Sequence, residues 1–191
     1  TGVRLLDKPD SLSRAQGEIH PQGNPHYNLN PENGPLIARN IEAGLARIDP
    51  AHAADYRKNL AAYLAELEPK IAEWRRMAAG LKGVTAVSSH KDVPYLAAFT
   101  GIDFVDTIEL KPGIAPTPTH LAALVKKMKE QKVTLIVREQ QYDAKTPAWL
   151  AEQTGAKVAV IGTMANSLPG TDTFIKLSEP NLSNLLKAAA K

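Results

Sequence analysis

Two histidines and one glutamate stand at positions where side chains often bind ligands. His26 lies in a tight turn between Pro25 and Pro31, and His90 follows a short apolar segment that ends in two serines. Glu139 ends a segment rich in β-branched residues. Neutral imidazole is the commonest metal ligand in proteins, and carboxylates complete such sites. If the fold brings these side chains together, they predict a site for a divalent metal ion.

Each of these residues also has an ordinary structural interpretation. His90 could cap a helix, His26 could be an exposed loop residue, and Glu139 could lie at the exposed rim of a sheet. The other histidines are weaker candidates, because one precedes the turn and two fall in the first turns of predicted helices: His20, His52 and His120.

The sequence carries no motif that would by itself indicate an enzyme. It has no glycine-rich phosphate loop, no nucleophile elbow and no helix with two zinc-binding histidines. It also has no cysteine, which excludes disulfides, thiolate metal sites and cysteine nucleophiles. We therefore expect no enzyme. Two alternatives stay open: a metal-dependent hydrolase-like enzyme with Glu139 as general base and His90 as acid or ligand, and a metal-independent adhesin or interaction domain.

Charge and hydropathy bear on other classes of partner. The net charge is +3, and Lys126, Lys127, Lys129 and Lys132 fall on one helix and its exit without interleaved aromatic residues. This pattern indicates a solvated helix face, so we expect no nucleic-acid partner. No apolar run is long enough to cross a bilayer. No charged-then-apolar segment opens the sequence, so we expect any signal peptide to have been removed or to lie outside it.

The second half of the sequence predicts an α/β lobe. Apolar, β-branched segments alternate there with segments of helical periodicity. Such alternation is typical of a parallel sheet with helices layered on it, and its ligands lie beyond the carboxyl ends of the strands. The expected strands are 84–87, 104–108, 133–137 and 158–161, and the expected helices are 95–99, 119–131, 147–154 and 181–190. His90 and Glu139 fall at the ends of two of these strands.

The first half predicts two helices, 35–48 and 51–79. The second would span on the order of 40 Å at a rise of about 1.5 Å per residue, and Pro69 should kink it. A helix of that length can join two lobes. We therefore predict residues 1–50 as the remainder of an N-terminal lobe, 51–80 as a long linker helix and 81–191 as the C-terminal α/β lobe, all in one longer protein.

Four segments resemble those of one family, in the same order. Asn24–Pro31 resembles the motif Asp-Pro-His-x-Trp-Leu-Asp-Pro, and His90–Gly101 is similar to a His-x-x-x-x-Tyr-Leu segment with a following glycine. Lys111–Pro118 resembles a Pro-Gly-x-x-Pro-Ser-Pro helix start, and Glu139 matches a strand-end glutamate. The family is that of the metal-binding lipoprotein-like receptors (cluster A-I), the solute-binding proteins of zinc and manganese ABC importers. The resemblance covers most of the chain from about His20 onward.

The resemblance implies a metal site between two α/β lobes that are joined by a rigid long helix. It assigns His26 and His90 as two of the ligands, and the family's first histidine has no counterpart in this sequence. The family's last ligand is commonly an aspartate after the final strand, but none occurs there before Asp172. We therefore take Glu139 as the substitute ligand. Other candidates to complete the site are His20 and the segment Asn166–Asp172.

Three asparagines depart from the family's motif around His26. Asn24 and Asn30 replace aspartates whose carboxylates would orient the imidazole, and Asn28 replaces the tryptophan. The family's histidine-rich acidic loop is also absent, which leaves only His20 before the turn. These departures remove groups that would orient the ring, so we expect them to change the metal affinity more than the fold.

The resemblance implies a periplasmic or surface-anchored solute-binding protein that captures a divalent transition metal and delivers it to a membrane ABC permease. It implies no enzyme, and we expect a monomer. Imidazole ligands favour Zn²⁺, whereas Mn²⁺ prefers more oxygen. Zn²⁺ is therefore the expected metal, and Mn²⁺ is the alternative.

Metal affinity should fall when the pH drops below about 6.5, the unperturbed pKa of imidazole. The reason is that His26 and His90 must be neutral to bind metal, so protons compete with the metal as the pH falls. Calorimetric zinc titrations at several pH values between about 5 and 8 measure this dependence. An affinity that stays flat over that range would contradict the assignment of both histidines.

Overall fold

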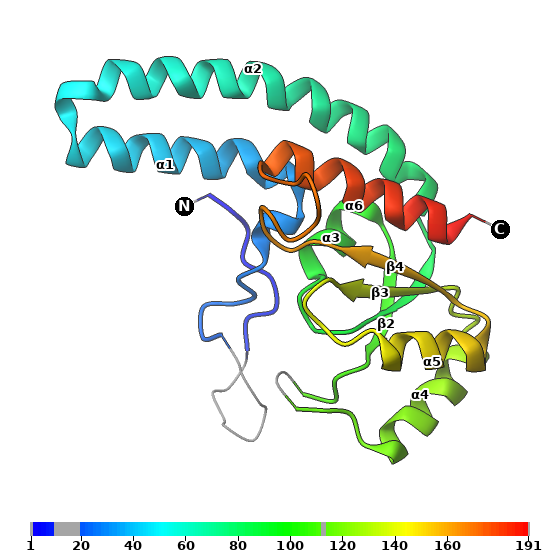
Figure 1. The fold of residues 1–191 in the computed structure, drawn as a ribbon. Helices are drawn as coiled ribbons and strands as arrows, with labels where there is room; N and C mark the ends of the chain where they lie inside the picture. The colour runs from blue at the N-terminus through cyan, green and yellow to red at the C-terminus, as the bar shows by residue number, and fades with distance from the viewer. Residues whose placement is uncertain (1, 10–19, 112–113, 191) are drawn as a thin grey trace.

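A computed structural model describes residues 2–9, 20–111 and 114–190. A four-stranded sheet carries helices on both faces, and a pair of long helices projects from one side (Figure 1). The strands lie in the order β2-β1-β3-β4, and every neighbouring pair is parallel. Their bounds are β1 Thr85–Ser88, β2 Asp103–Thr107, β3 Leu135–Glu139 and β4 Lys157–Ile161. The predicted parallel α/β lobe is thereby confirmed.

Helices cover the sheet from both sides and make three layers. α3, α6 and the end of α2 (Ala53–Ala78) pack on one face, whereas α4 and α5 pack on the other. Successive strand residues point to opposite faces, so Leu135 and Val137 enter the first core while Val87 and Ile136 enter the second. The bounds of the other helices are α3 Pro94–Thr100, α4 Pro118–Glu130, α5 Lys145–Thr154 and α6 Phe174–Ala189.

The strand order places a crevice between β1 and β3. The chain leaves β1 for β2 on one side, and then returns to β3 on the other side of β1. In open α/β sheets, ligands bind at such a reversal of strand order, beyond the carboxyl ends of the strands. His90 comes two residues after β1, and Glu139 is the last residue of β3. The topology therefore places both residues where a ligand site is expected.

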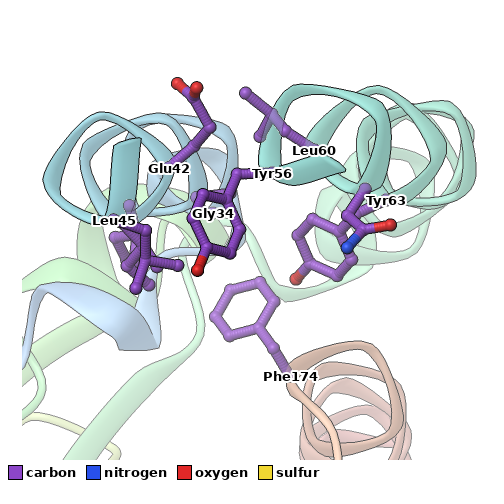
Figure 2. Close-up of a pocket in the computed structure, with 11 residues that line it drawn as sticks. Gly34, Glu42, Leu45, Tyr56, Leu60, Tyr63 and Phe174 are labelled. Atoms are coloured by element: carbon purple, nitrogen blue, oxygen red, sulfur yellow. The ribbon is translucent and has the colours of Figure 1, made fainter. Parts of the chain in front are cut away.

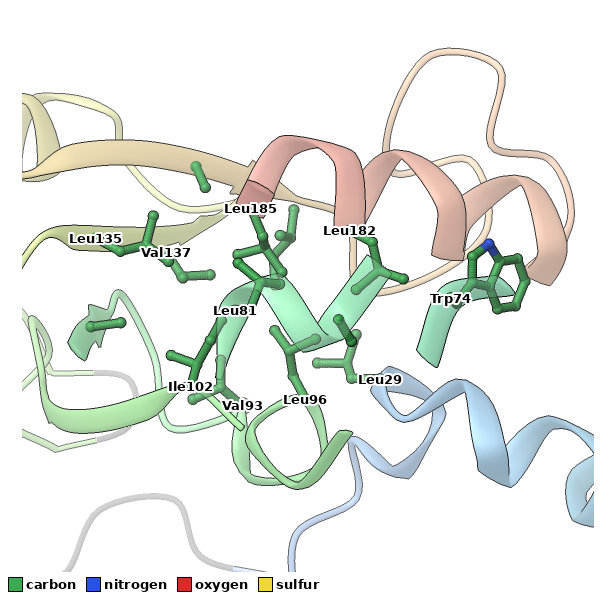
Figure 3. Packing of buried hydrophobic residues seen from close by; sticks show 14 of the residues in the cluster. Leu29, Trp74, Leu81, Val93, Leu96, Ile102, Leu135, Val137, Leu182 and Leu185 are labelled. Carbon is green, nitrogen blue, oxygen red and sulfur yellow. The ribbon is translucent and has the colours of Figure 1, made fainter. Parts of the chain in front are cut away.

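The larger core joins the sheet to the second half of α2. Figure 3 shows Leu182 and Leu185 of α6 close to Leu81, with Trp74 of α2 at the end of the same cluster. Leu67 and Trp74 are fully buried. Burying each such side chain stabilises the fold by roughly 1.5–3 kcal/mol. The second half of α2 is therefore an integral part of the lobe.

The first half of α2 instead pairs with α1 (Gly34–Ile48) in a hairpin. The short turn Pro50–His52 joins the two helices (Figure 1). α2 continues through Pro69, and Figure 1 shows its second half curving toward the sheet. Ile41 is 57% exposed and Ile48 is 72% exposed, so α1 presents apolar surface to solvent. None of the helices in the described ranges is both long and apolar enough to cross a bilayer.

An apolar groove of about 520 Å³ lies between α1 and α2 (Figure 2). Leu45 of α1 and Tyr56 and Tyr63 of α2 line it, and Phe174 of α6 points into it. None of the three predicted metal ligands contributes to its lining. The groove is therefore separate from the chemistry at the sheet edge.

α6 begins at Phe174, well before the predicted start at residue 181. Pro180 directly precedes the predicted start, but this proline lies inside the helix. The Thr173 side chain caps the first turn, and Asn181 exchanges two hydrogen bonds of 2.8 Å with the backbone of Gly162. These tertiary contacts offset the hydrogen bond that a proline removes from a helix.

Candidate metal centre

The turn that carries His26 is organised by Asn24. The Asn24 Oδ1 atom accepts hydrogen bonds from the His26 backbone N–H at 3.0 Å and from the ring Nδ1 at 2.9 Å. The Asn24 Nδ2 atom donates to the Lys91 carbonyl oxygen at 2.8 Å, which fixes the end of the amide that faces the ring. Since an amide oxygen only accepts, Nδ1 carries the proton and Nε2 keeps its lone pair. Nε2 is therefore the atom of His26 that can bind a metal.

His90 is oriented in a similar way by Glu109. Its ring Nδ1 lies 2.6 Å from Glu109 Oε2, and both side chains are 16% exposed. The Tyr142 ring stacks on the imidazole, with centroids 5.4 Å apart and an interplanar angle of 22°. A carboxylate on Nδ1–H fixes the tautomer and makes Nε2 a better metal ligand. His90 thus also presents Nε2.

The fold brings the two histidines together although they lie far apart in the sequence. Their ring centroids are 6.1 Å apart, at an interplanar angle of 77°. The hydrogen bond from Asn24 to Lys91 ties the turn of His26 directly to the loop of His90. The two predicted histidine ligands therefore share one place at the carboxyl edge of the sheet.

Two buried carboxyl groups lie beside these imidazoles. Glu139 is 0% exposed and Asp92 is 1% exposed. Asp92 interacts electrostatically with both histidines, and it also lies next to Glu139. Asp92 and Glu139 lie within hydrogen-bonding reach of each other, and within the described residues no other side chain donates a hydrogen bond to their four oxygens. Buried polar groups nearly always have a partner, and a cation at this place would supply one for all four.

Burial sets the protonation of these groups. Burial raises the pKa of Glu139, and the neighbouring Asp92 charge raises it further. Burial also raises the pKa of Asp92, against the opposing effect of protonated His26 and His90. Burial lowers the pKa of His26, against the opposing effect of Asp92. At neutral pH the metal-free site therefore holds a neutral His26 and at least one proton on the carboxyl pair.

The sequence analysis missed Asp92. A lone aspartate between Lys91 and Val93 has the pattern of a solvated loop residue, and nothing in the sequence indicates that it is buried. The one available signal is its position two residues after His90, at a strand end. Glu139 was placed correctly at the end of a strand, but its complete burial was not predicted.

The candidate donor side chains do not surround a single point. In the part of the chain that the structure describes, no three His, Asp, Glu or Cys side chains are already placed to hold one metal ion together. His20 is exposed. Asp172 is exposed as well, and it pairs with Lys176 at 2.9 Å. The structure thus gathers the three predicted ligands in one region, with His20 close enough to act electrostatically on His26 and Asp172 paired with Lys176.

The asparagines of the turn hold it in place. The expected weaker orientation of His26 is not observed, because the Asn24 amide oxygen takes over the role of a carboxylate. Asn30 accepts a hydrogen bond of 2.9 Å from the backbone N–H of Glu32 and caps the short helix Pro31–Asn33. Asn28, which caps nothing, donates at 2.7 Å to the carbonyl oxygen of Thr163, in the loop after β4.

Comparison with known proteins identifies close relatives of the chain. A family model described as "Zinc-uptake complex component A periplasmic" matches residues 2–188. The high-affinity zinc uptake system protein ZnuA of Brucella abortus (strain 2308) is 31% identical over 166 residues, which cover 85% of this chain and 48% of that protein. The chain thus spans about half the length of this curated relative.

Solved structures share the fold. A crystal structure of ZnuA matches with a TM-score of 0.77 and 25% identity, over 99% of this chain and 67% of that chain. A Mn-bound periplasmic metal-binding protein from Candidatus Liberibacter asiaticus matches with a TM-score of 0.76, over 99% of this chain and 69% of that chain. At 20% identity, this second likeness is one of fold.

Replacing Glu109 with alanine should weaken zinc binding by about 10- to 100-fold, because His90 loses the group that fixes its tautomer. The zinc affinity of Glu109→Gln should lie between those of the parent and of Glu109→Ala, since an amide oxygen still accepts the hydrogen bond. Competition with a coloured zinc chelator measures the affinities. The control is Glu130→Ala, at a side chain of α4 that is 63% exposed, and it should match the parent. A Glu109→Ala variant with the parent's affinity would show that His90 is not held for a metal.

Proposed function

This chain belongs to the ZnuA family of periplasmic zinc-uptake components, and from that premise we propose that it binds a divalent metal ion for delivery to a membrane ABC importer. The metal lies beyond the carboxyl ends of β1 and β3, where His26 and His90 meet. Glu139 is the third proposed ligand from this chain. The metal is cargo, so none of these residues is catalytic.

One observation carries the proposal: two oriented imidazoles stand beside a buried carboxyl pair that lacks hydrogen-bond partners. Asn24 and Glu109 each hold a histidine by its Nδ1 atom, so both rings can offer Nε2. Apart from their contact with Asp92, the oxygens of Glu139 accept no hydrogen bond from any described side chain. An ordinary loop histidine needs neither a group that holds its Nδ1 atom nor an unpaired carboxyl group beside it, whereas a metal site uses both.

We propose Zn²⁺ as the preferred cargo and Mn²⁺ as the alternative. Imidazole suits zinc and carboxylate oxygen suits manganese, and a mixed site binds zinc more tightly because affinity rises from Mn²⁺ toward the end of the first transition series. The name of the Brucella relative specifies zinc. The Candidatus Liberibacter structure contains manganese. Both metals therefore enter the tests below.

The proposed setting is the periplasm or the outer face of the cell membrane, with an ABC permease as partner and a monomer as the working form. The family description names the periplasm and an uptake complex. Because the chain spans about half of its curated relative, we propose that further metal ligands and part of the permease contact come from a region with no counterpart here. This accounts for the incomplete arrangement around the two histidines.

The enzymatic alternative is disfavoured on two grounds. The ZnuA family comprises binding components of an uptake system and not enzymes. In addition, the proposed general base Glu139 is fully buried, and burial raises its pKa well above neutrality. A general base works best when its pKa lies near the operating pH, so Glu139 is poorly suited to that role.

We also propose a division of the chain into three parts: residues 1–50 as the remainder of an N-terminal lobe, 51–80 as the linker helix and 81–191 as the C-terminal lobe. The second half of α2 packs in the core of the C-terminal lobe, whereas its first half contacts α1. The groove between α1 and α2 is an apolar surface that includes the exposed Ile41, and Ile48 is exposed at the end of α1. The rest of the N-terminal lobe is the proposed occupant of this surface, since the curated relative is about twice as long.

Zinc titration by calorimetry tests the proposed function, on this chain and on any longer natural form of it. His26→Ala and His90→Ala should each weaken binding by about 100-fold or more, beyond the 10- to 100-fold typical of losing a group that only orients a ligand. His52→Ala is the matched control, because His52 is exposed and pairs with Asp49 at the turn between α1 and α2. If no form binds metal, the histidines are ordinary loop residues and a metal-independent interaction domain becomes the better explanation.

The charged substitution Ile41→Asp tests the proposed occupant of the groove. In this chain alone it should change the free energy of unfolding by less than about 0.5 kcal/mol, because Ile41 is 57% exposed. In a longer natural form it should cost roughly 3–5 kcal/mol, because the second lobe would bury an unpaired charge. Urea denaturation of both forms measures this, with Arg57→Asp on the exposed side of α2 as control. Equal effects in the two forms would argue against a lobe on this surface.

A further inference from the structure

We propose that Asp92 is a metal ligand that acts together with Glu139, and that this pair determines how well the site accepts Mn²⁺ relative to Zn²⁺. The inference rests on the proposed function and extends it. Asp92 lies two residues after His90, in the loop between β1 and α3, and is 1% exposed. It therefore belongs to the same segment as one of the histidine ligands.

The unpartnered polar atoms of the lobe are concentrated at this place. Among the described residues, six buried side-chain nitrogen or oxygen atoms have no hydrogen-bond partner. Five of them belong to Ser89, Asp92 and Glu139, which lie next to His90 or at the end of the adjacent strand, and the sixth is the indole nitrogen of Trp74. A shared lack of partners at one sheet edge points to a common ligand at that edge.

Other aspartates of the chain show what a structural role looks like. Asp106 forms an ion pair of 2.7 Å with Lys127. Asp49 accepts hydrogen bonds from Tyr56 and from His52. All of these side chains are at least partly exposed. The partly exposed carboxylates thus have partners although water could also serve them. The most deeply buried carboxylates, Asp92 and Glu139, lack such partners, and packing does not explain this difference.

The carboxylate of Asp92 can supply the oxygen donor that is missing after β4. The loop after β4 offers no aspartate before Asp172, which pairs with Lys176 away from the site. Asp92 and Glu139 supply four oxygens beside the two imidazoles, and carboxylate oxygen is the donor that Mn²⁺ prefers. Since the side chains do not yet surround one point, binding requires the carboxyl groups and the rings to turn toward each other.

The isosteric variant Asp92→Asn tests this role, because it removes the charge and keeps the shape. Zn²⁺ and Mn²⁺ affinities are measured by competition titration, and the thermal midpoint is measured without metal. Affinity for Mn²⁺ should fall at least about tenfold and by more than affinity for Zn²⁺ does, since oxygen donors matter more to manganese. The midpoint without metal should stay equal or rise, because a neutral amide of the same shape replaces a buried carboxyl group beside Glu139. Asp172→Asn is the matched control and should change neither affinity.

The outcomes separate this inference from the proposed function. If zinc still binds through His26 and His90 but Asp92→Asn keeps the parent's affinity for both metals, Asp92 is not a ligand and only the inference fails. A lower midpoint without metal, together with unchanged affinities, would assign Asp92 a purely structural role. If the parent chain and its longer natural form bind neither metal, the proposed function and the inference fall together.

Discussion

Two carboxyl groups with no side-chain hydrogen-bond partner but each other lie buried where β1 and β3 end. Leaving a buried polar group unpaired costs about 1–3 kcal/mol, and more for a charged one. The fold can bear this cost because two separate cores, one on each face of the sheet, surround the strands that carry them. Protonation lowers the cost in the metal-free protein, since burial raises the pKa of Glu139 and of Asp92. A bound cation would remove it more completely, because it would pair with both groups in their charged form.

The same edge of the sheet fixes the turn that carries His26. Asn24 reaches the loop after β1 by donating to Lys91, and Asn28 reaches the loop after β4 by donating to Thr163. The turn is thus attached to the ends of two strands rather than held by its own short helices. Amide side chains suit this arrangement because they donate and accept at once, whereas an ionised aspartate only accepts. The departures from the family motif therefore change how the turn is attached and preserve the orientation of the imidazole.

The sequence predicted the regular parts of the fold and the position of two ligands, but not what surrounds them. The four strands were found because β-branched runs such as Val133–Val137 have few other interpretations. The start of α6 was missed because Pro180 has the pattern of a boundary, and only tertiary contacts of Asn181 show otherwise. The proximity of the two histidines came from the family resemblance, since no local pattern links two turns so distant in sequence. Asp92 was missed because burial is a property of the folded chain.

The proposed ligands come from two separate segments of the chain. His26 lies on a turn that leads into α1 and α2, whereas the other three donors belong to the sheet edge. Asn24 ties the two ligand loops together by its hydrogen bond to Lys91, and Leu29 of the turn packs in the same core as Val93. Because the first half of α2 lies outside the lobe core, a displacement of the helical hairpin would act on the His26 turn before it reached the sheet. The position of His26 therefore depends on the contacts of its turn, whereas Asp92 and Glu139 are held inside the lobe.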